Sequence, residues 1–178
     1  AAPNPAVGSV EEIDGFDDLK AVAEDLQARK DEFGLDGAFA STSLLPGEEW
    51  RWTNHLMNGP LHYEIVDRDI SDFSEMAQAE FTYERQFRQL FDLYLENSTV
   101  PPALATGRAT SDAMAEFATG KAAMVQNGNW AWSQIAGVGG NVIKEDKIKF
   151  MPMYMGMPDE ERNGLNVGTE NYLAVNSR

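Results

Sequence analysis

The sequence predicts an α/β domain in which helices alternate with short buried strands. Segments with apolar residues at helical spacing alternate along the chain with apolar runs of strand length, and no internal repeat interrupts this order. With 178 residues, the chain is long enough for one domain with a substantial core. We therefore expect residues 1–178 to form a single α/β unit.

The first third of the chain is predicted to contain two helices and one strand. Asp14 can cap a helix over residues 14–30, whose apolar positions recur at helical spacing. Residues 37–41 form a short apolar run that is typical of a buried strand. A second helix is predicted over residues 48–57, and the Asn-Gly-Pro sequence at 58–60 is expected to end it.

The middle of the chain is predicted to contain a weak strand followed by two helices. Residues 63–70 alternate weakly between apolar and polar side chains, which favours an edge strand. Residues 81–95 carry a strong helical stripe of aromatic and leucine side chains. The Thr-Ser-Asp sequence at 110–112 is a cap signal for a further helix over residues 113–118.

The last third is predicted to supply three strands and one short helix. Residues 121–126 are expected to form a strand, followed by a tight Asn-Gly turn and a short helix that Asn129 caps and that runs through residue 135. Two further strands are predicted over residues 147–153 and 172–175. The expected core comes from these strands and from the 81–95 helix: Phe39, Leu90, Phe91, Met124, Val125, Phe150 and Leu173.

The composition excludes several classes of function. The 29 acidic and 14 basic residues give a net charge of −15, which repels phosphate backbones and anionic lipid, so nucleic acid is not an expected partner. The absence of cysteine rules out disulfides and thiolate metal sites. The two histidines, His55 and His62, suit neither a metal site nor a triad and are expected to be solvated or to cap helices. We predict no catalytic residue, no metal and no cofactor.

The four tryptophans occur as two Trp-x-Trp pairs, Trp50 with Trp52 and Trp130 with Trp132. Residues two apart on a helix are rotated by roughly 200°, so one ring of each pair can enter the core while the other faces outward. Large outward-facing aromatic rings often mark binding surfaces. Two such pairs suggest a cleft with flat aromatic walls, which suit a sugar ring.

Four segments of the chain resemble the sugar-binding receptors of ABC importers. The most specific is residues 117–135, where Phe-Ala-Thr-Gly, an Ala-Met pair and Asn-Gly lead into Trp-Ala-Trp-Ser. Asp-Gly-Phe-Asp-Asp-Leu at 14–19, Trp-Arg-Trp at 50–52 and the segment 166–177 resemble the family in the same order and at similar spacing. Together these segments are spread over the chain from about residue 12 to residue 177.

The resemblance implies one lobe of a two-lobe, type II periplasmic-binding-protein-like fold. Receptors of this family are about twice as long, so we expect residues 1–178 to be a contiguous piece of the C-terminal lobe, without the N-terminal lobe and with both ends near the hinge. The implied function is capture of a mono- or oligosaccharide and its delivery to the transporter's membrane subunits. We expect a monomeric, extracellular or periplasmic lipoprotein that is not an enzyme.

The resemblance also assigns ligand-binding residues. Trp130 matches a tryptophan that stacks on the sugar ring, and Trp50 matches a second aromatic contact, whereas Trp52 and Trp132 are expected in the core. The other predicted contacts are polar residues at a helix start and in a late turn: Glu48, Glu49, Gly168, Thr169, Glu170 and Asn171. Glu49 stands where the maltose-binding members have a tyrosine, so the identity of the sugar does not carry over.

Alternative interpretations stay open at this point. A glycoside hydrolase would also need an aromatic cleft, together with two carboxylates about 5–9.5 Å apart, and Glu48 and Glu49 point in different directions on one helix. A structural lobe without activity of its own is a third possibility, because half of the expected cleft is absent.

Overall fold

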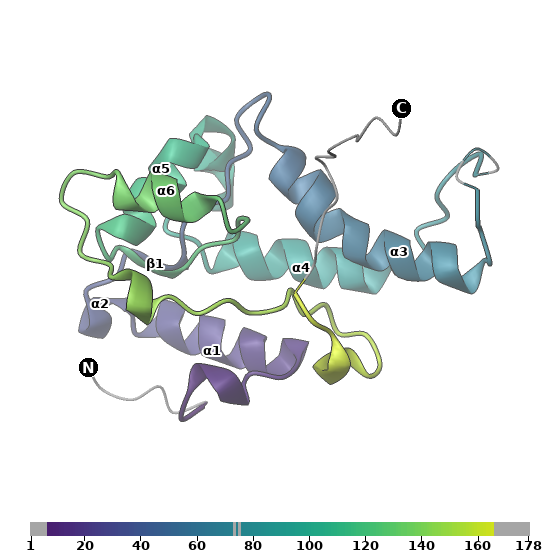
Figure 1. Cartoon of the computed structure of the whole chain (residues 1–178), viewed down its shortest axis with the longest axis horizontal. Helices are drawn as coiled ribbons and strands as arrows, with labels where there is room; N and C mark the ends of the chain where they lie inside the picture. The colour runs from purple at the N-terminus through teal and green to yellow at the C-terminus, as the bar shows by residue number, and fades with distance from the viewer. Residues whose placement is uncertain (1–6, 73, 75, 166–178) are drawn as a thin grey trace, which may run out of the picture.

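The chain folds into a mixed α/β structure around a small parallel sheet (Figure 1). The computed structural model describes residues 7–72, 74 and 76–165. Strands β1 (Gly37–Phe39) and β2 (Ala122–Met124) pair in parallel, with Gly37 opposite Ala122 and Phe39 opposite Met124. Both strands lie within the runs predicted from the sequence. A parallel bridge from Phe39 to Ser98 continues the pairing on the other side of β1.

The described part of the chain contains six α-helices. Their bounds are α1 Phe16–Ala28, α2 Lys30–Phe33, α3 Asn58–Asp67, α4 Glu84–Glu96, α5 Thr110–Ala118 and α6 Ala131–Ala136. A π-helical segment, Arg51–Met57, leads directly into α3. Short 3₁₀ turns cover Val10–Glu12, Pro102–Gly107, Glu145–Lys147 and Glu160–Arg162. None of the described helices is long and apolar enough to cross a membrane.

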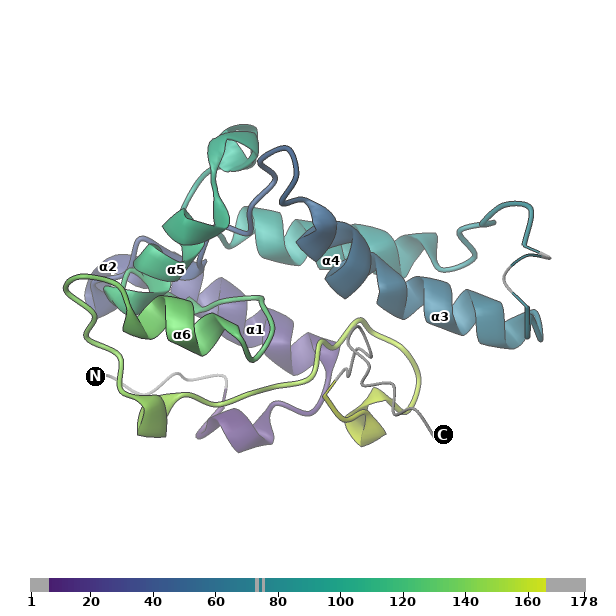
Figure 2. The same ribbon diagram turned by 45° about the horizontal axis from the view of Figure 1, so that its top comes forward.

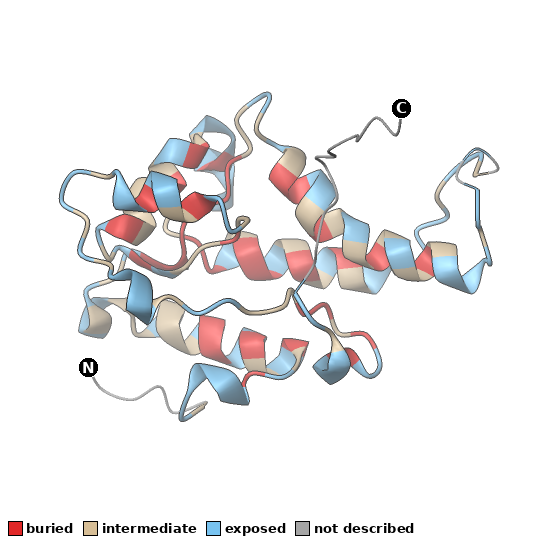
Figure 3. Cartoon of the chain, viewed as in Figure 1, coloured by how far each residue is buried: buried red, intermediate tan, exposed pale blue. Residues whose placement is uncertain are grey.

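Two hydrophobic clusters hold these elements together (Figure 3). The larger cluster joins the apolar faces of α1 and α4 to β1, with Leu19, Phe39 and Leu90 among its buried members. The smaller cluster joins α5 and α6 to β2, through small and medium side chains such as Ala118 and Ile135. Phe91, Met124 and Val125, which were expected in the core, are only partly buried and pack against these clusters.

Residues 63–67 belong to α3 and residues 68–70 follow its end, so the predicted edge strand at 63–70 is wrong. The Asn-Gly-Pro sequence does not end a helix, because Pro60 lies in the first turn of α3, where a missing N–H group is tolerated. The π-helical segment contacts both α3 and α4, and these two helices extend away from the sheet in both views (Figures 1 and 2). Buried Glu64 on α3 accepts hydrogen bonds from the backbone N–H groups of Glu80 and Thr82, at 2.7 and 3.0 Å.

The predicted strand at 147–153 is also wrong. Lys147 is the last residue of a 3₁₀ turn, and residues 148–153 form no strand. Phe150 is 60% exposed, although it was expected in the core. Met151 and Met153 still pack against the larger cluster, so the apolar pattern there reflects packing without strand pairing. The strand predicted at 172–175, with Leu173, lies outside the described residues.

The residues that precede α1 and α6 also differ from the predicted capping residues. Gly15, and not Asp14, precedes α1, and the N–H group of Phe16 donates to the Glu160 carboxylate at 2.6 Å. The short helix α6 follows Trp130 without a side-chain cap from Asn129.

The first prediction concerns acid stability. The backbone N–H of Glu80, with help from Thr82 and Arg68, lowers the pKa of Glu64 from its ordinary value of 4.5. Because the unfolded state then binds the proton more readily, this interaction stabilises the fold above about pH 4.5 and is lost as the pH falls through the lowered folded-state pKa. We expect the melting temperature to fall less between pH 6 and pH 3 in Glu64→Gln than in the wild type. An equal fall in both proteins would contradict this role.

The second prediction concerns the close approach of the chain at β1. A Cβ atom on Gly37 would lie 2.4 Å from both the carbonyl carbon of Ser98 and the backbone nitrogen of Thr99. Backbone atoms cannot move away as a flexible side chain can, so Gly37→Ala should destabilise the protein by about 1–3 kcal/mol or more. Gly107→Ala, where no atom lies within 4 Å, is the control. Urea denaturation of the two variants measures the difference, and equal stabilities would refute the argument.

Candidate functional site

The candidate site lies where the chain leaves the carboxyl ends of the two strands. After β1 the chain reaches the π-helical segment Arg51–Met57, and after β2 it passes through Gln126 and Gly128 to Trp130. In open α/β folds, ligands bind in the crevice outside the carboxyl ends of parallel strands. The two connections therefore carry their side chains to the end of the sheet where binding sites are usually found.

Three aromatic side chains meet at this place, and we call Trp50, His55 and Trp130 the aromatic cluster. The ring centroids of Trp50 and Trp130 are 6.2 Å apart, so the two tryptophans that were predicted to face outward are in contact. The His55 ring meets Trp50 edge-on at 5.0 Å and lies 5.9 Å from Trp130. Trp130 is 45% exposed, so the cluster presents an indole to solvent.

The π-helical winding explains the position of His55. Residues five apart are connected by hydrogen bonds in a π-helix, whereas an α-helix places residues three and four apart on one face. His55 is five residues after Trp50, and in this wider turn their rings meet. His55 is therefore half-buried in the aromatic cluster, so the expectation of a solvated or capping residue is wrong for His55, whereas His62 is exposed. π-Helical turns are rare and occur frequently at functional sites.

Arg51 covers one face of Trp50. Its guanidinium carbon lies 4.2 Å from the centroid of the indole, which is cation–π geometry. The side chain is 8% exposed, and its Nη1 atom donates to the backbone carbonyl of Glu48 at 3.4 Å. Since Trp50 is half-buried between Arg51 and the other rings, Trp130 offers the larger free surface.

Gln126 contacts the aromatic cluster through His55. Its Nε2 atom lies 2.6 Å from Nδ1 of His55 and 3.8 Å from the sulfur of Met153, and the residue is 7% exposed. Its Oε1 atom is buried without a hydrogen-bond partner among the described residues, and so is Nε of Arg51. Within the described part of the chain, no other buried side-chain polar atom lacks a hydrogen-bond partner. Both belong to side chains that contact the aromatic cluster.

The predicted polar contacts have different positions. The Glu48 carboxylate accepts hydrogen bonds from the backbone N–H and the hydroxyl of Thr110, which lower the pKa of Glu48 and hold the start of α5. Glu49 is exposed beside Trp50. Gly168, Thr169, Glu170 and Asn171 lie outside the described residues.

The inner members of the tryptophan pairs face away from the cluster. Trp52 is 2% exposed, stacks on Phe91 at 4.9 Å and donates its indole N–H to the carbonyl of Thr42 at 3.3 Å. Trp132 is only partly buried, at the edge of the smaller hydrophobic cluster. The core position expected for Trp52 is confirmed, and that of Trp132 is correct only in part.

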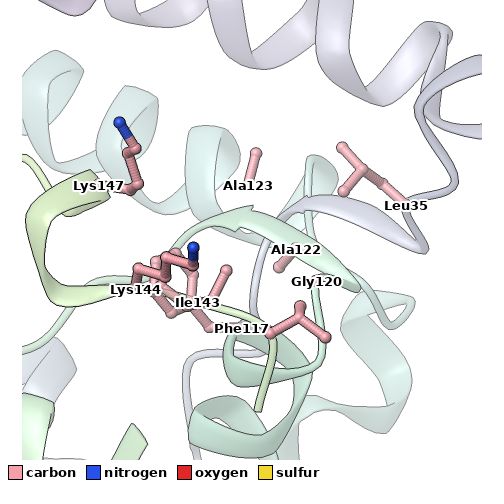
Figure 4. A pocket seen from close by; sticks show the side chains of 9 residues that line it. Leu35, Phe117, Gly120, Ala122, Ala123, Ile143, Lys144 and Lys147 are labelled. Carbon is pink, nitrogen blue, oxygen red and sulfur yellow. The ribbon is translucent and has the colours of Figure 1, made fainter. Parts of the chain in front are cut away.

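A hollow in the described surface lies away from the aromatic cluster (Figure 4). It measures about 570 Å³ and is formed around Leu35, Phe117 and Val142, with Lys144 and Lys147 at its edge. Gly120 and Ala122 place it at the amino-terminal end of β2, opposite to the end that carries Gln126. It is shallow and shares no residue with the aromatic cluster.

The third prediction concerns the seat of Trp130. A Cβ atom on Gly128 would lie 2.1–2.5 Å from three ring carbons of Trp130, so the indole lies directly against the Gly128 backbone. Gly128→Ala should displace this ring without unfolding the protein, because the ring is half exposed and can move. We expect a shifted indole N–H resonance for Trp130 in NMR spectra and an unchanged one for Trp52. Gly139→Ala, which adds its methyl group to open space, should change neither resonance.

Comparison of the chain with protein-family models, with curated proteins and with solved structures found no match. The residues that sequence reasoning missed are Arg51, His55 and Gln126. Arg51 lies between the two members of the Trp50 pair and Gln126 directly precedes the Asn-Gly turn at 127–128, whereas His55 follows Trp50 by five residues.

Proposed function

We propose that this chain is a sugar-capturing lobe of a receptor for an ABC importer. It belongs to the C-terminal lobe of a type II, two-lobe receptor in which a mono- or oligosaccharide binds between the lobes. The lobes close over the sugar by hinge motion, and the transporter's membrane subunits accept the closed form. The receptor acts at the extracellular or periplasmic face, anchored to the membrane, and performs no chemistry on its ligand.

One observation carries this proposal: the two unpartnered buried polar atoms flank the aromatic cluster. Buried polar groups are nearly always hydrogen-bonded, so each exception requires an explanation. Here a donor, Nε of Arg51, belongs to a side chain that packs on Trp50, and an acceptor, Oε1 of Gln126, belongs to a side chain that contacts His55. A sugar offers apolar ring faces for the indole and hydroxyl groups that both donate and accept, so its chemistry fits this combination.

A binding role is favoured over a glycoside hydrolase by the state of the two neighbouring carboxylates. Glu48 is committed to Thr110 at the start of α5 and serves the fold. That leaves Glu49 as the nearby carboxylate on this segment, whereas a glycosidase needs two that face each other across the bond to be cut. Incubation with oligosaccharides and analysis for cleavage products separates the two functions.

The fourth prediction tests the function through Trp130. One lobe provides an open half-site, so the 178-residue chain should bind its sugar with a dissociation constant in the millimolar range or weaker, at about −4 kcal/mol or less favourable. NMR titration with a panel of neutral and acidic sugars measures binding of this strength. Trp130→Ala should weaken it at least about tenfold, because truncated tryptophan anchors typically cost about 2 kcal/mol or more.

The control is Trp132→Ala, which removes the same side chain two residues further along the helix. It should leave sugar binding nearly unchanged, because Trp132 packs against the smaller hydrophobic cluster and away from Trp50. Equal binding by wild type and Trp130→Ala would refute the proposed sugar site.

A further inference from the structure

The hollow at the amino-terminal end of β2 has a lining that differs in charge from the chain as a whole (Figure 4). Of the nine described residues that line it, Lys144 and Lys147 are basic and none is acidic. The whole chain, in contrast, has 29 acidic residues and 14 basic ones. Every other residue of the lining is apolar or glycine. The hollow therefore combines apolar walls with positive charge, in a protein whose net charge is −15.

The walls of this hollow come from segments that are distant in sequence. Ile143 lies on one side and Leu35 on the other, with residues 122–123 of β2 between them (Figure 4). The backbone N–H of Val142 donates to the carbonyl of Ala118 at 2.9 Å, which fixes the first wall to the end of α5. Because residues 122–123 are alanines, their short side chains leave the space between the walls open. Val142 is 66% exposed, so this wall presents apolar surface to solvent.

The two lysines are accessible and only weakly engaged. No carboxylate of a described residue lies within 4 Å of Nζ of Lys144. Lys147 is paired with its chain neighbour Asp146 at 3.7 Å, and these two side chains are 75% and 71% exposed. Exposed pairs of this kind contribute little, because water and salt weaken them. An anion that enters the hollow can therefore interact with both ammonium groups without breaking a strong ion pair.

We infer that this hollow binds small amphiphilic anions, molecules with a short apolar body and one anionic group. The apolar body packs against the side chains of Leu35, Val142 and Ile143, and the anionic group lies at Lys144 and Lys147. The volume of about 570 Å³ is within the range of small-molecule sites. Ammonium groups act as point charges, so they select an anion without selecting its geometry. The site is independent of the proposed sugar site, because it shares no residue with the aromatic cluster.

NMR titration of the wild-type chain with four probes tests the apolar and the charged part of this site: hexanoate, 1-hexanol, hexylammonium and acetate. Salt at about 0.15 M screens the negative charges of the chain that lie farther away than about 8 Å. Hexanoate should shift the backbone amides of residues 120–123 and 142–147 in a saturable manner. It should bind about threefold or more tightly than 1-hexanol, as two exposed ion pairs allow. Hexylammonium, with the opposite charge, and acetate, without the apolar body, should both bind more weakly than hexanoate.

Substitutions at exposed positions locate the effect without disturbing the core. Lys144→Gln and Lys147→Gln should each weaken hexanoate binding about twofold or more and leave 1-hexanol binding unchanged. Val142→Ser should weaken both probes, because it removes apolar surface from the wall. Lys20→Gln removes the same charge from a lysine that is 49% exposed on α1, outside the hollow, and should change neither.

Three results would overturn the inference. The first is binding of 1-hexanol, hexylammonium or acetate as tightly as hexanoate, because the lysines or the apolar walls then select nothing. The second is unchanged hexanoate binding in both Lys144→Gln and Lys147→Gln. The third is the absence of saturable shifts at residues 120–123 and 142–147, since apolar walls and ammonium groups do not distinguish a simple amphiphilic anion from a complex one. The indole N–H resonance of Trp130 should not respond to hexanoate, so this site and the sugar site are tested separately.

Discussion

Replacement of Trp52 by alanine should destabilise the protein by about 3–5 kcal/mol, the cost typical of removing a buried tryptophan. The indole is 2% exposed and stacks on Phe91 from α4, so its loss opens a cavity between the π-helical segment and that helix. It also leaves the carbonyl of Thr42 without the indole N–H as its donor. Urea denaturation measures the loss.

Two control variants define this result. Trp52→Phe should recover much of the stability, because a phenylalanine ring restores the stacking on Phe91 while the hydrogen bond to Thr42 stays broken. Trp132→Ala should cost clearly less than Trp52→Ala, since Trp132 is only partly buried. If Trp132→Ala were the more damaging of the two, the assignment of core and peripheral rings would be reversed.

Replacement of Glu160 by glutamine should also be strongly destabilising, by about 3 kcal/mol, although the two side chains have nearly the same shape. One carboxylate oxygen accepts the N–H groups of Met155, Gly156 and Met157 at 2.8, 2.8 and 3.3 Å. The other accepts the N–H of Phe16 at 2.6 Å. An amide can offer an acceptor to only one of these two sides and presents its own donor to the other.

The effect of Glu160→Gln should be local as well as global. Hydrogen exchange should accelerate at residues 155–157 and at the first turn of α1, which this buried side chain connects. Glu161→Gln, an exposed neighbour with the same change of charge, is the matched control and should alter stability by less than about 0.5 kcal/mol. Equal effects of the two variants would show that the hydrogen bonds of Glu160 contribute little.

The sequence predicts most helices and both strands because their apolar residues recur with a clear period. The 81–95 stripe became α4, and the runs at 37–41 and 121–126 contain β1 and β2. Residues 63–70 were assigned wrongly because Pro60 was read as a stop, although its place in the first turn makes it compatible with α3. Residues 147–153 have an apolar pattern but no pairing partner in the described structure, and no local signal reports that.

Of the residues in the candidate site, the sequence predicted only the two outward-facing tryptophans. Trp50 and Trp130 follow from the pairing of tryptophans, and the structure brings them into contact. His55 could not be found, because α-helical spacing does not place it beside Trp50 and the sequence carries no sign of the π-helical winding. The unpartnered atoms of Arg51 and Gln126 are properties of the packed structure, since burial and hydrogen bonding depend on segments distant in sequence.

The most direct test of the sugar site is to follow the four indole N–H resonances of the chain while sugar is added. The account predicts that the resonances of Trp130 and Trp50 shift in a saturable manner, because these rings form the aromatic cluster. It also predicts that Trp52 and Trp132, which face the hydrophobic clusters, shift little. Saturable shifts confined to Trp52 or Trp132 would contradict it.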